Sequence, residues 1–484
     1  MISPLGVAAI AFLSLVNWAE AQVTPVVTVV TSSITSVSFH STNPTAIPLQ
    51  SIWSGATGQS TVAISSPAAP GATPPIKGAP PLPSWTFSPS LGFPPLDQVP
   101  DTNSSLVQEW IKEVANSGVT IPNLESTVPG GCPTNPTLAA NTSRCWWSCG
   151  GCTRSTDITT CPDKMTWGLS YDDGPSPYST DLLNYLDANN LKTTFFIVGS
   201  RAISRPDILA AEYLSGHQLS VHTWSHPDLT TLTNEQIIAE LGWTKKAIHD
   251  ITGVTPNTWR PPYGSIDDRV RAIGQAMGLT AIIWTTGPNG LDYDTCVVQS
   301  VLQTFTVFIF FFFKNFIFFS NFGARNDWFI PAGYPTGEVL DNFANIMNSA
   351  PALNTGFIIL EHDLYQQTVD LAIGYILPNA LSQPQFTLMS IISCLHKPLS
   401  DAYIETNDNS TNPPGKGYTT LGSSGSSTGA FHSGSSSTKA TQGGQASTTS
   451  KSGAAPARLS LSVEGNKGAA GALAAIWFGV VLLL

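Results

Sequence analysis

The chain has 484 residues, of which 42% are hydrophobic and 11% carry a charge, and its formal net charge at pH 7 is -11. This acidic balance argues against a nucleic-acid partner, because no basic face is available to neutralise phosphates. The length corresponds to about three average domains, yet only residues 125 to 400 have a composition that can build a sizeable core.

The N-terminal part has the features of an exported protein. Residues 1–21 contain an apolar stretch of signal-peptide length that ends in Ala19-Glu20-Ala21, an A-x-A cleavage pattern. Residues 22–124 are rich in Ser, Thr, Pro and Ala, most strongly as far as residue 100. This composition buries too little apolar surface to offset the entropy of ordering, so we predict a low-complexity stalk or linker. Three glycosylation sequons fit an exported chain with flexible flanks: Asn103, Asn141 and Asn409.

Cysteines are concentrated in a lead-in at residues 125–160. The pattern C-x3-C-x2-C at 145–152 is compatible with a metal site, but an exported chain favours disulfide bonds. The total is odd, which leaves one thiol over in an oxidising compartment. The seven cysteines are Cys132, Cys145, Cys149, Cys152, Cys161, Cys296 and Cys394.

From Met165 onward, strand-like and helix-like segments alternate. Two amphipathic helices are predicted at 178–190 and 233–253, the second opening with a capping box of Thr233 and Gln236. Helices between apolar strands imply a parallel sheet, and about seven such units predict an α/β fold of the (β/α) barrel type. The strand candidates are residues 165–171, 192–199, 217–223, 257–264, 280–286, 355–362 and 386–394.

Polar residues end several of these strands, where a barrel places its chemistry. They are Asp172, Asp173, His222, His226, Arg260, Glu361, His362 and Asp363. The two histidines are four residues apart, a spacing that puts both imidazoles on one face of a helical turn, where they can grip a cation. Asp173 adds a third ligand and leaves coordination positions open, as hydrolytic zinc sites require. A histidine pair alone is equally compatible with a structural role.

Asp172 precedes the aspartate ligand, and adjacent residues of an extended chain project in opposite directions. A carboxylate beside a metal site is placed to act as the general base, and His362 is then the candidate general acid. The competing interpretation of Asp172-Asp173-Gly174-Pro175 is an ordinary turn, since these residue types favour turns.

Four ordered segments resemble the motifs of the polysaccharide deacetylase family, which is the NodB type or carbohydrate esterase family 4. SYDDGPSP resembles the first motif, HTWSH the second, RPPYG at 260–264 the third and IILEHD at 358–363 the fifth. The resemblance predicts a deacetylase domain at residues 161–398 and implies a distorted (β/α) barrel of the NodB type with disordered N- and C-terminal flanks. The remainder of the chain is similar to fungal chitin deacetylases displayed on the cell wall.

The resemblance also implies a role for each matching residue. Asp172 would be the base and His362 the acid, while Asp173, His222 and His226 would bind a divalent metal, Zn or Co. Arg260 would hold the base carboxylate through a bidentate pair, and the backbone N–H of Tyr263 would help stabilise the oxyanion. Substrate-binding residues would be Pro261, Tyr263 and Trp328. Trp224 is a further residue that either stacks on a sugar or packs in the core.

The implied reaction is hydrolysis of the N-acetyl groups of N-acetylglucosamine units in chitin, giving chitosan and acetate. A chitin-type polymer would be the partner, and no protein partner is implied. Two alternatives remain open, namely a catalytically silent chitin-binding wall protein and a deacetylase of another acetylated glycan, such as acetylxylan or peptidoglycan.

The fourth motif of the family, D/R-x-x-D-W, is interrupted. Residues 305–319 read FTVFIFFFFKNFIFF, and removal of residues 296–325 joins Asp294-Thr295 to Asn326-Asp327-Trp328, which restores the motif. The removal also eliminates Cys296 and leaves an even number of cysteines, with Cys161 and Cys394 as a plausible pair. We therefore predict that residues 296–325 are an unspliced intron, and that Asp327 tunes the catalytic histidine while Trp328 lines the site.

Other interpretations of this segment are weaker. A membrane span is opposed by Lys314-Asn315 in its middle, a core helix by the lack of a 3.6-residue period, and a strand pair by its aggregation hazard. If the segment is translated, misfolding or an inactive site is expected.

The C-terminal part resembles a lipid-anchored tail. Residues 399–458 are rich in Ser, Thr and Gly and predict a linker, and residues 459–484 end in an apolar stretch with no charge behind it. This layout predicts a glycosylphosphatidylinositol signal with Ser452 as the candidate anchor residue, and hence attachment at the plasma membrane or cell wall. An ordinary tail anchor is the alternative.

Overall fold

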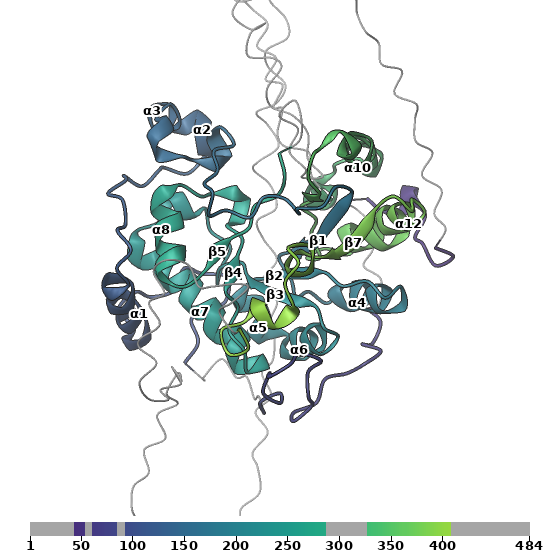
Figure 1. The fold of residues 1–484 in the computed structure, drawn as a ribbon, viewed down its shortest axis with the longest axis horizontal. Coiled ribbons are helices and arrows are strands. Elements are labelled where there is room, and N and C mark those ends of the chain that lie inside the picture. The colour runs from purple at the N-terminus through teal and green to yellow at the C-terminus, as the bar shows by residue number, and fades with distance from the viewer. Residues whose placement is uncertain (1–42, 54–60, 85–91, 287–326, 408–484) are drawn as a thin grey trace, which may run out of the picture. The chain divides into compact units, whose positions relative to one another are not determined.

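The computed structural model describes residues 43–53, 61–84, 92–286 and 327–407 (Figure 1). All of them belong to the first of two units, Met1–Ser427, and the second unit, Thr428–Leu484, lies outside the described residues. Several predictions therefore fall outside the described part of the chain: the signal peptide, the block 296–325 with Cys296, most of the C-terminal linker, the anchor signal with Ser452, and the sequon at Asn409.

The core is a parallel sheet of seven strands. The order is β5-β4-β3-β2-β1-β6, and β7 also pairs with β1. Each of the seven strand candidates overlaps one of these strands, although most strands are shorter than predicted. The strands are β1 (Thr166–Asp172), β2 (Thr194–Ile197), β3 (Gln218–Val221), β4 (Thr258–Trp259), β5 (Thr280–Ala281), β6 (Phe357–Ile358) and β7 (Thr387–Ser390).

The two edges of the sheet meet, so that the strands form a barrel. Just beyond β5, the Thr285 N–H donates to the Ile358 carbonyl of β6 at 3.1 Å, which connects the first strand of the order to the last. Strand β7 pairs with the first half of β1, whereas β2 pairs with its last three residues. The prediction of a distorted barrel is confirmed, and β7 is the source of much of the distortion because it lies beside β1 only at the N-terminal ends of the strands.

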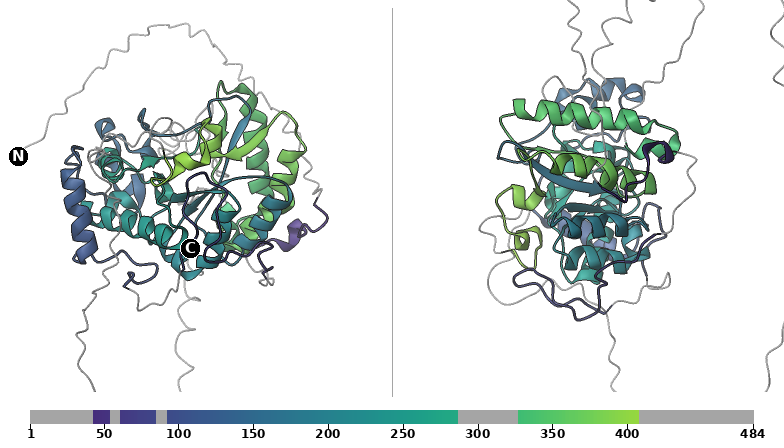
Figure 2. Two further views of the ribbon diagram at one scale, coloured as in Figure 1. Left: turned by 60° about the horizontal axis from the view of Figure 1, so that its bottom comes forward. Right: turned by 90° about the vertical axis from the view of Figure 1, so that its right-hand side faces the viewer.

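Helices cover the outside of the strands (Figures 1 and 2). Both predicted helices are present, and Thr233 and Gln236 form the expected capping box of α7. The helices of the barrel are α4 (Ser179–Ala188), α5 (Gly199–Ser204), α6 (Pro206–Leu214), α7 (Asn234–Thr252), α8 (Asp268–Ala276), α10 (Thr336–Ser349), α11 (Gln366–Leu371), α12 (Leu377–Leu381) and α13 (Ile391–Cys394). None of the helices in the described ranges has both the length and the apolar character needed to cross a membrane.

The segment before residue 125 differs from the stalk that we expected. Helix α1 (Ser105–Asn116) packs on α7, where a Cβ on Gly242 would collide with the Trp110 ring. Upstream of α1, Ile52, Ile76 and Leu82 are also buried. A chain with few apolar residues can still bind the barrel when each one fills a position on a preformed surface, and its prolines lower the entropy lost on ordering.

The cysteine-rich lead-in is joined by disulfides, not by a metal. Cys132 pairs with Cys149 and Cys145 with Cys152, beside the short helices α2 (Gly131–Thr134) and α3 (Pro136–Ala139). The expected pair Cys161–Cys394 is also present and ties the segment before β1 to α13.

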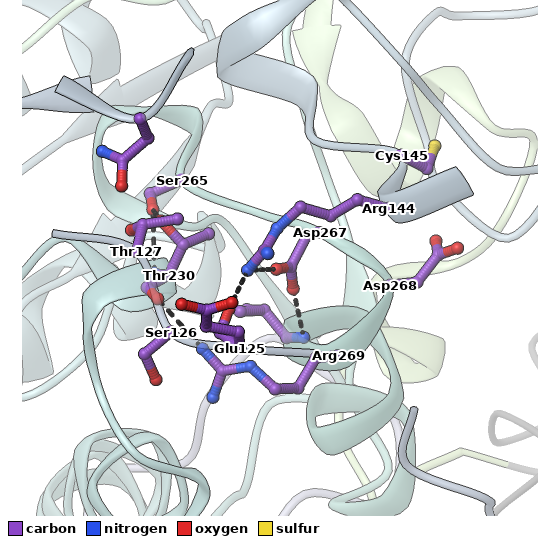
Figure 3. A network of polar contacts seen from close by, with 12 residues as sticks. Glu125, Ser126, Thr127, Arg144, Cys145, Thr230, Ser265, Asp267, Asp268 and Arg269 are labelled. Carbon is purple, nitrogen blue, oxygen red and sulfur yellow. Dashed lines mark hydrogen bonds and ion pairs between the residues drawn. The ribbon is translucent and has the colours of Figure 1, made fainter. Parts of the chain in front are cut away.

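A buried polar network attaches the lead-in to the barrel (Figure 3). Arg144 Nη2 lies 2.8 Å from Asp267 Oδ2 and donates to the Glu125 carbonyl. The hydroxyls of Thr127 and Thr230 are 2.8 Å apart. Because buried charges are costly unless they are paired, these contacts fix the lead-in in one position on the barrel.

Candidate active site

The strand ends converge as a parallel barrel requires. Asp172 ends β1, His222 follows β3, and Arg260 follows β4. Beyond β6, His362 forms a parallel bridge with Asp172, whose N–H donates to the Glu361 carbonyl at 2.9 Å. Residues nearly 200 positions apart in the sequence are thereby brought to one end of the barrel.

Three of these side chains form a group that could hold a metal ion. One ligand atom each from Asp173, His222 and His226 lies within 4.8 Å of the others. The Asp173 Oδ1 is 3.0 Å from His226 Nε2 and 3.5 Å from His222 Nε2. Two imidazole nitrogens and one carboxylate oxygen are a donor set that suits zinc and similar divalent ions.

The Nδ1 atom of each histidine has a partner on the side away from this group. His222 Nδ1 lies 2.8 Å from the Arg260 carbonyl, and His226 Nδ1 lies 3.1 Å from the Tyr263 hydroxyl. A carbonyl can only accept, so His222 Nδ1 carries the proton and its Nε2 is free to bind a cation. Burial and the neighbouring His226 lower the pKa of His222 well below its usual value, which also favours the neutral ligand form. The residues therefore fit a divalent metal.

The local structure of the histidine pair differs from the prediction. Residues 222–226 form a loop, not a helical turn, and Thr223 and His226 have φ values of 68° and 60°. The two rings nevertheless approach to 5.0 Å between centroids. A loop with two left-handed residues folds both imidazoles to one side without a helix, so the predicted proximity was right and the predicted conformation was wrong.

The side chains of the two adjacent aspartates do not project in opposite directions, as neighbouring residues of a strand would. Asp173 leaves the strand with φ of 78°, and the carboxylates of Asp172 and Asp173 lie 3.6 Å and 3.5 Å from His222 Nε2. Burial by itself would raise the pKa of Asp173, but His226, His362 and Arg201 bring it well below its usual value. A carboxylate that stays charged is the form needed for a metal ligand.

Asp172 is buried and paired with Arg260. Arg260 Nη1 donates to Asp172 Oδ1 at 2.6 Å and to the Ser170 hydroxyl at 3.0 Å, a shared nitrogen where we expected a bidentate pair. The guanidinium lies over the Phe196 ring at 3.9 Å from its centroid. Burial raises the pKa of Asp172 to about 6, although Arg260 and His362 act in the opposite direction.

His362 is joined to Asp327, the second residue after the block 296–325. Its Nδ1 lies 2.6 Å from Asp327 Oδ1, and its backbone N–H donates to Asp327 Oδ2 at 2.9 Å. Burial by itself would lower the pKa of His362, but Asp327 and the nearby Asp173 and Asp172 raise it to about 10. Trp328 lies in the same 3-10 helix, Asp327–Ala332, and its side chain is outside the described part.

The third motif places Tyr263 at the surface of the site. Tyr263 is 56% exposed and has φ of 58°, and Pro261 caps the short helix Pro262–Gly264 that contains it. Trp224 is fully buried, so the interpretation of this residue as core packing is confirmed and sugar stacking by it is excluded.

Some residues of the site were missed or left without a role by sequence reasoning. Arg201 donates to the Asp173 carbonyl at 2.7 Å, and Glu240 accepts hydrogen bonds from Trp224 and Ser225. Glu240 had a detectable signal, since it is a carboxylate on the otherwise apolar, buried face of the predicted helix 233–253. Asp363, adjacent to the acid candidate, accepts from the Ser179 hydroxyl, and burial raises its pKa to about 7.

The fold and the site together define a class: an α/β-barrel protein with a candidate mononuclear metal site beside a buried carboxylate and a buried histidine, both with raised pKa values. A family model described as Polysaccharide deacetylase matches residues 159–282. The chain is 51% identical over 392 residues to "Chitin deacetylase 1" of Cryptococcus neoformans var. grubii, an alignment that covers 79% of this chain and 76% of that protein. It is also 42% identical over 172 residues to "Chitin deacetylase" of Amylomyces rouxii, covering 34% of this chain and 41% of that protein.

The chain therefore belongs to the polysaccharide deacetylase family, and the prediction of an enzyme of this family is confirmed. Among solved structures, the chitin deacetylase from Colletotrichum lindemuthianum is 24% identical, with a TM-score of 0.39 over 51% of this chain and 95% of that one. A second similar structure is the Bc1960 peptidoglycan N-acetylglucosamine deacetylase, 21% identical with a TM-score of 0.38 over 50% of this chain and 94% of that one.

Proposed function

We propose that this protein hydrolyses the N-acetyl groups of N-acetylglucosamine units in chitin, giving chitosan and acetate at the fungal cell surface. Support for the substrate comes from the relative of Cryptococcus neoformans that is 51% identical over most of both chains and is named a chitin deacetylase. Support for the reaction comes from one observation above all, namely a buried carboxylate and a buried histidine beside the candidate metal site, whose pKa values of about 6 and about 10 leave both groups charged over the same range of pH.

Asp173, His222 and His226 would hold the metal, with Zn and Co both suited to this donor set. A bound divalent ion would polarise the acetyl carbonyl and make water a better nucleophile. With a pKa of about 6, Asp172 is ionised at neutral and alkaline pH and can take a proton from the attacking water. Arg260 keeps this carboxylate oriented through its 2.6 Å contact.

The second proton transfer falls to His362. With a pKa of about 10 it is protonated when Asp172 is ionised, and its Nδ1 is held by Asp327, which leaves Nε2 as the acid. Breakage of the amide C–N bond would release acetate while this proton goes to the departing sugar nitrogen. Tyr263, exposed beside His226, would offer its ring to the sugar and its backbone N–H to the oxyanion, with Pro261 and Trp328 as further substrate contacts.

Acetate release from chitin oligomers tests the proposal directly. We expect release by the purified protein that stops on chelation and returns when zinc or cobalt is added back. Acetylxylan and peptidoglycan fragments serve as competing substrates, and higher kcat/KM on either would reassign the substrate. Binding of chitin without any release would favour the silent wall protein.

Attachment to the surface is part of the proposal. The C-terminal apolar stretch and Ser452 support a glycosylphosphatidylinositol anchor, and exposed Asn103 and Asn141 are compatible with glycosylation. Release of the protein from membranes by a phosphatidylinositol-specific phospholipase is expected, and retention after this treatment would favour the tail anchor.

A further inference from the structure

A carboxylate that has no role in the proposed reaction accepts hydrogen bonds from the loop that carries His222 and His226. Glu240, on α7, is fully buried. Its Oε2 accepts from the backbone N–H groups of Trp224 at 2.7 Å and Ser225 at 2.9 Å, and its Oε1 accepts from the Ser225 hydroxyl at 2.6 Å. All three donors belong to the two residues directly before His226, so one side chain fixes this half of the loop.

Residues 93–97, which we call the strap, make a second set of contacts with the loop. The strap precedes the segment matched by the family model and contacts Trp224, at the centre of the loop. Trp224 Nε1 donates to the Pro95 carbonyl at 3.0 Å, and the Phe93 ring lies parallel to the indole, with an angle of 3° and centroids 6.0 Å apart. Trp243 of α7 contacts both rings and closes the cluster.

The strap also contacts α5, which holds the other side of the site. Asp97 accepts from the Ser200 hydroxyl at 2.9 Å, and the N–H of Ser200 donates to the Trp224 carbonyl at 3.1 Å. The next residue, Arg201, donates to the Asp173 carbonyl. Strap, α5 and loop are thus joined by hydrogen bonds, and this set reaches the carbonyl of the candidate ligand Asp173 and the two residues directly before the candidate ligand His226.

The loop needs such support because of its backbone. Thr223 is β-branched, and its φ of 68° lies in the left-handed region that such residues rarely adopt. His226, also left-handed, bonds back to the Thr223 hydroxyl through its N–H at 3.0 Å. Strained conformations of this kind persist only when the surroundings impose them.

We propose that Glu240 and the strap are positioning elements of the metal site, which hold His222 and His226 at the separation that a divalent ion requires. The proposal rests on the proposed function only in assuming that the site binds a metal. It extends the working site beyond the matched segment, to residues that precede the barrel.

Zinc affinity of the complete protein, measured by calorimetry after chelator treatment, is the test because it needs no substrate. In Glu240→Leu, the two N–H groups and the hydroxyl of the loop lose their acceptor, and we expect 10- to 100-fold weaker zinc binding, about the usual effect of losing a partner that orients metal ligands. Glu405→Leu is the matched control. Glu405 accepts from the N–H and hydroxyl of Thr255, at 2.7 and 2.8 Å, at the entrance of β4 and hence at the other end of the barrel. We expect it to leave zinc affinity unchanged.

The strap is tested by Trp224→Phe, which keeps an aromatic ring but loses the hydrogen bond to Pro95, and by Phe93→Leu. Both are expected to weaken zinc binding several-fold, with Trp167→Phe as the control for a fully buried tryptophan at the start of β1. Folded variants at Glu240, Trp224 and Phe93 that all bind zinc within twofold of the wild type would overturn the proposal. A wild type that binds zinc but releases no acetate from chitin would overturn the proposed function and leave this inference intact.

Discussion

At the scale of single residues, burial and neighbouring charges set the protonation states of two side chains of the site. Asp172 and His362 lie beside each other across a parallel bridge and are both buried. Arg260 pairs with the first and Asp327 with the second, so each ionisable group has a partner of opposite charge. The result is a carboxylate that is ionised and an imidazole that is protonated over the same range of pH.

Asp172→Asn is the most direct change at this scale. Loss of the proton acceptor is expected to lower kcat/KM for acetate release by about 100- to 10,000-fold, the usual contribution of a general base. Zinc affinity should stay close to that of the wild type, because Asp172 is not one of the three ligand candidates. A variant that retains more than a tenth of the activity would show that another group acts as base.

Asp327→Asn tests the tuning of His362 through the pH profile. His362 must be protonated to act as an acid, so wild-type activity is expected to decline as the pH rises through about 10. Without the aspartate the effect of burial dominates, the pKa of His362 falls, and the alkaline limb of kcat/KM moves to lower pH by at least one unit. The ion pair also stabilises the fold fully below pH ~6.5, and this contribution is lost as the pH rises through the folded-state pKa. An unmoved alkaline limb would mean that Asp327 does not set it.

At the scale of elements, a feature that neighbouring residues encode was predicted correctly, whereas the end of a strand that depends on distant contacts was not. The capping box that begins α7 is local, and it was predicted residue by residue. Residues 386–394 read as one continuous strand, but β7 ends at Ser390 and α13 follows, where Ile391 and Ile392 are buried and Cys394 is bonded to Cys161. An apolar run of this length does not distinguish a strand from a buried helical turn.

The Cys161–Cys394 disulfide is expected to be the most stabilising of the three, because it closes a segment with a sequence separation of 233. Replacing both cysteines by serine should lower the free energy of unfolding by about 2–5 kcal/mol, measured by urea denaturation. The Cys145–Cys152 pair, with a separation of 7, is the comparison and should cost less. Equal losses for the two pairs would contradict an origin in chain entropy.

At the scale of the whole molecule, the described residues nearest to the phenylalanine-rich block on each side lie close enough for a shorter connection between them. Thr285 contacts Ile358 and Asp327 contacts His362, two points about 13 Å apart along an extended strand. If residues 296–325 are absent, residues 286–295 and 326 connect Thr285 to Asp327, and a chain of this length reaches up to about 36–40 Å. The shortened connection is therefore long enough.

We predict that the mature transcript lacks the codons for residues 296–325, which sequencing of messenger RNA across Thr295 and Asn326 will show. The protein without this block is expected to be soluble and to release acetate. The form that retains it should aggregate or be inactive, because an exposed phenylalanine-rich segment is an aggregation hazard. Mature messages that keep the whole block, together with an active full-length protein, would refute the intron hypothesis.

The sequence by itself determined the barrel class, the seven strand positions and the residues that end the strands, because periodicity and motif spacing are local properties of the chain. The family resemblance also pointed to Asp327 as the partner of His362 across the interrupting block, a contact that is present. Only the tertiary structure decided that residues 222–226 are a strained loop, that Glu240 and residues 93–97 support it, and that much of the N-terminal segment lies on the barrel. Those outcomes depend on contacts between residues more than a hundred positions apart in some cases, as between Pro95 and Trp224, and no local pattern encodes such contacts.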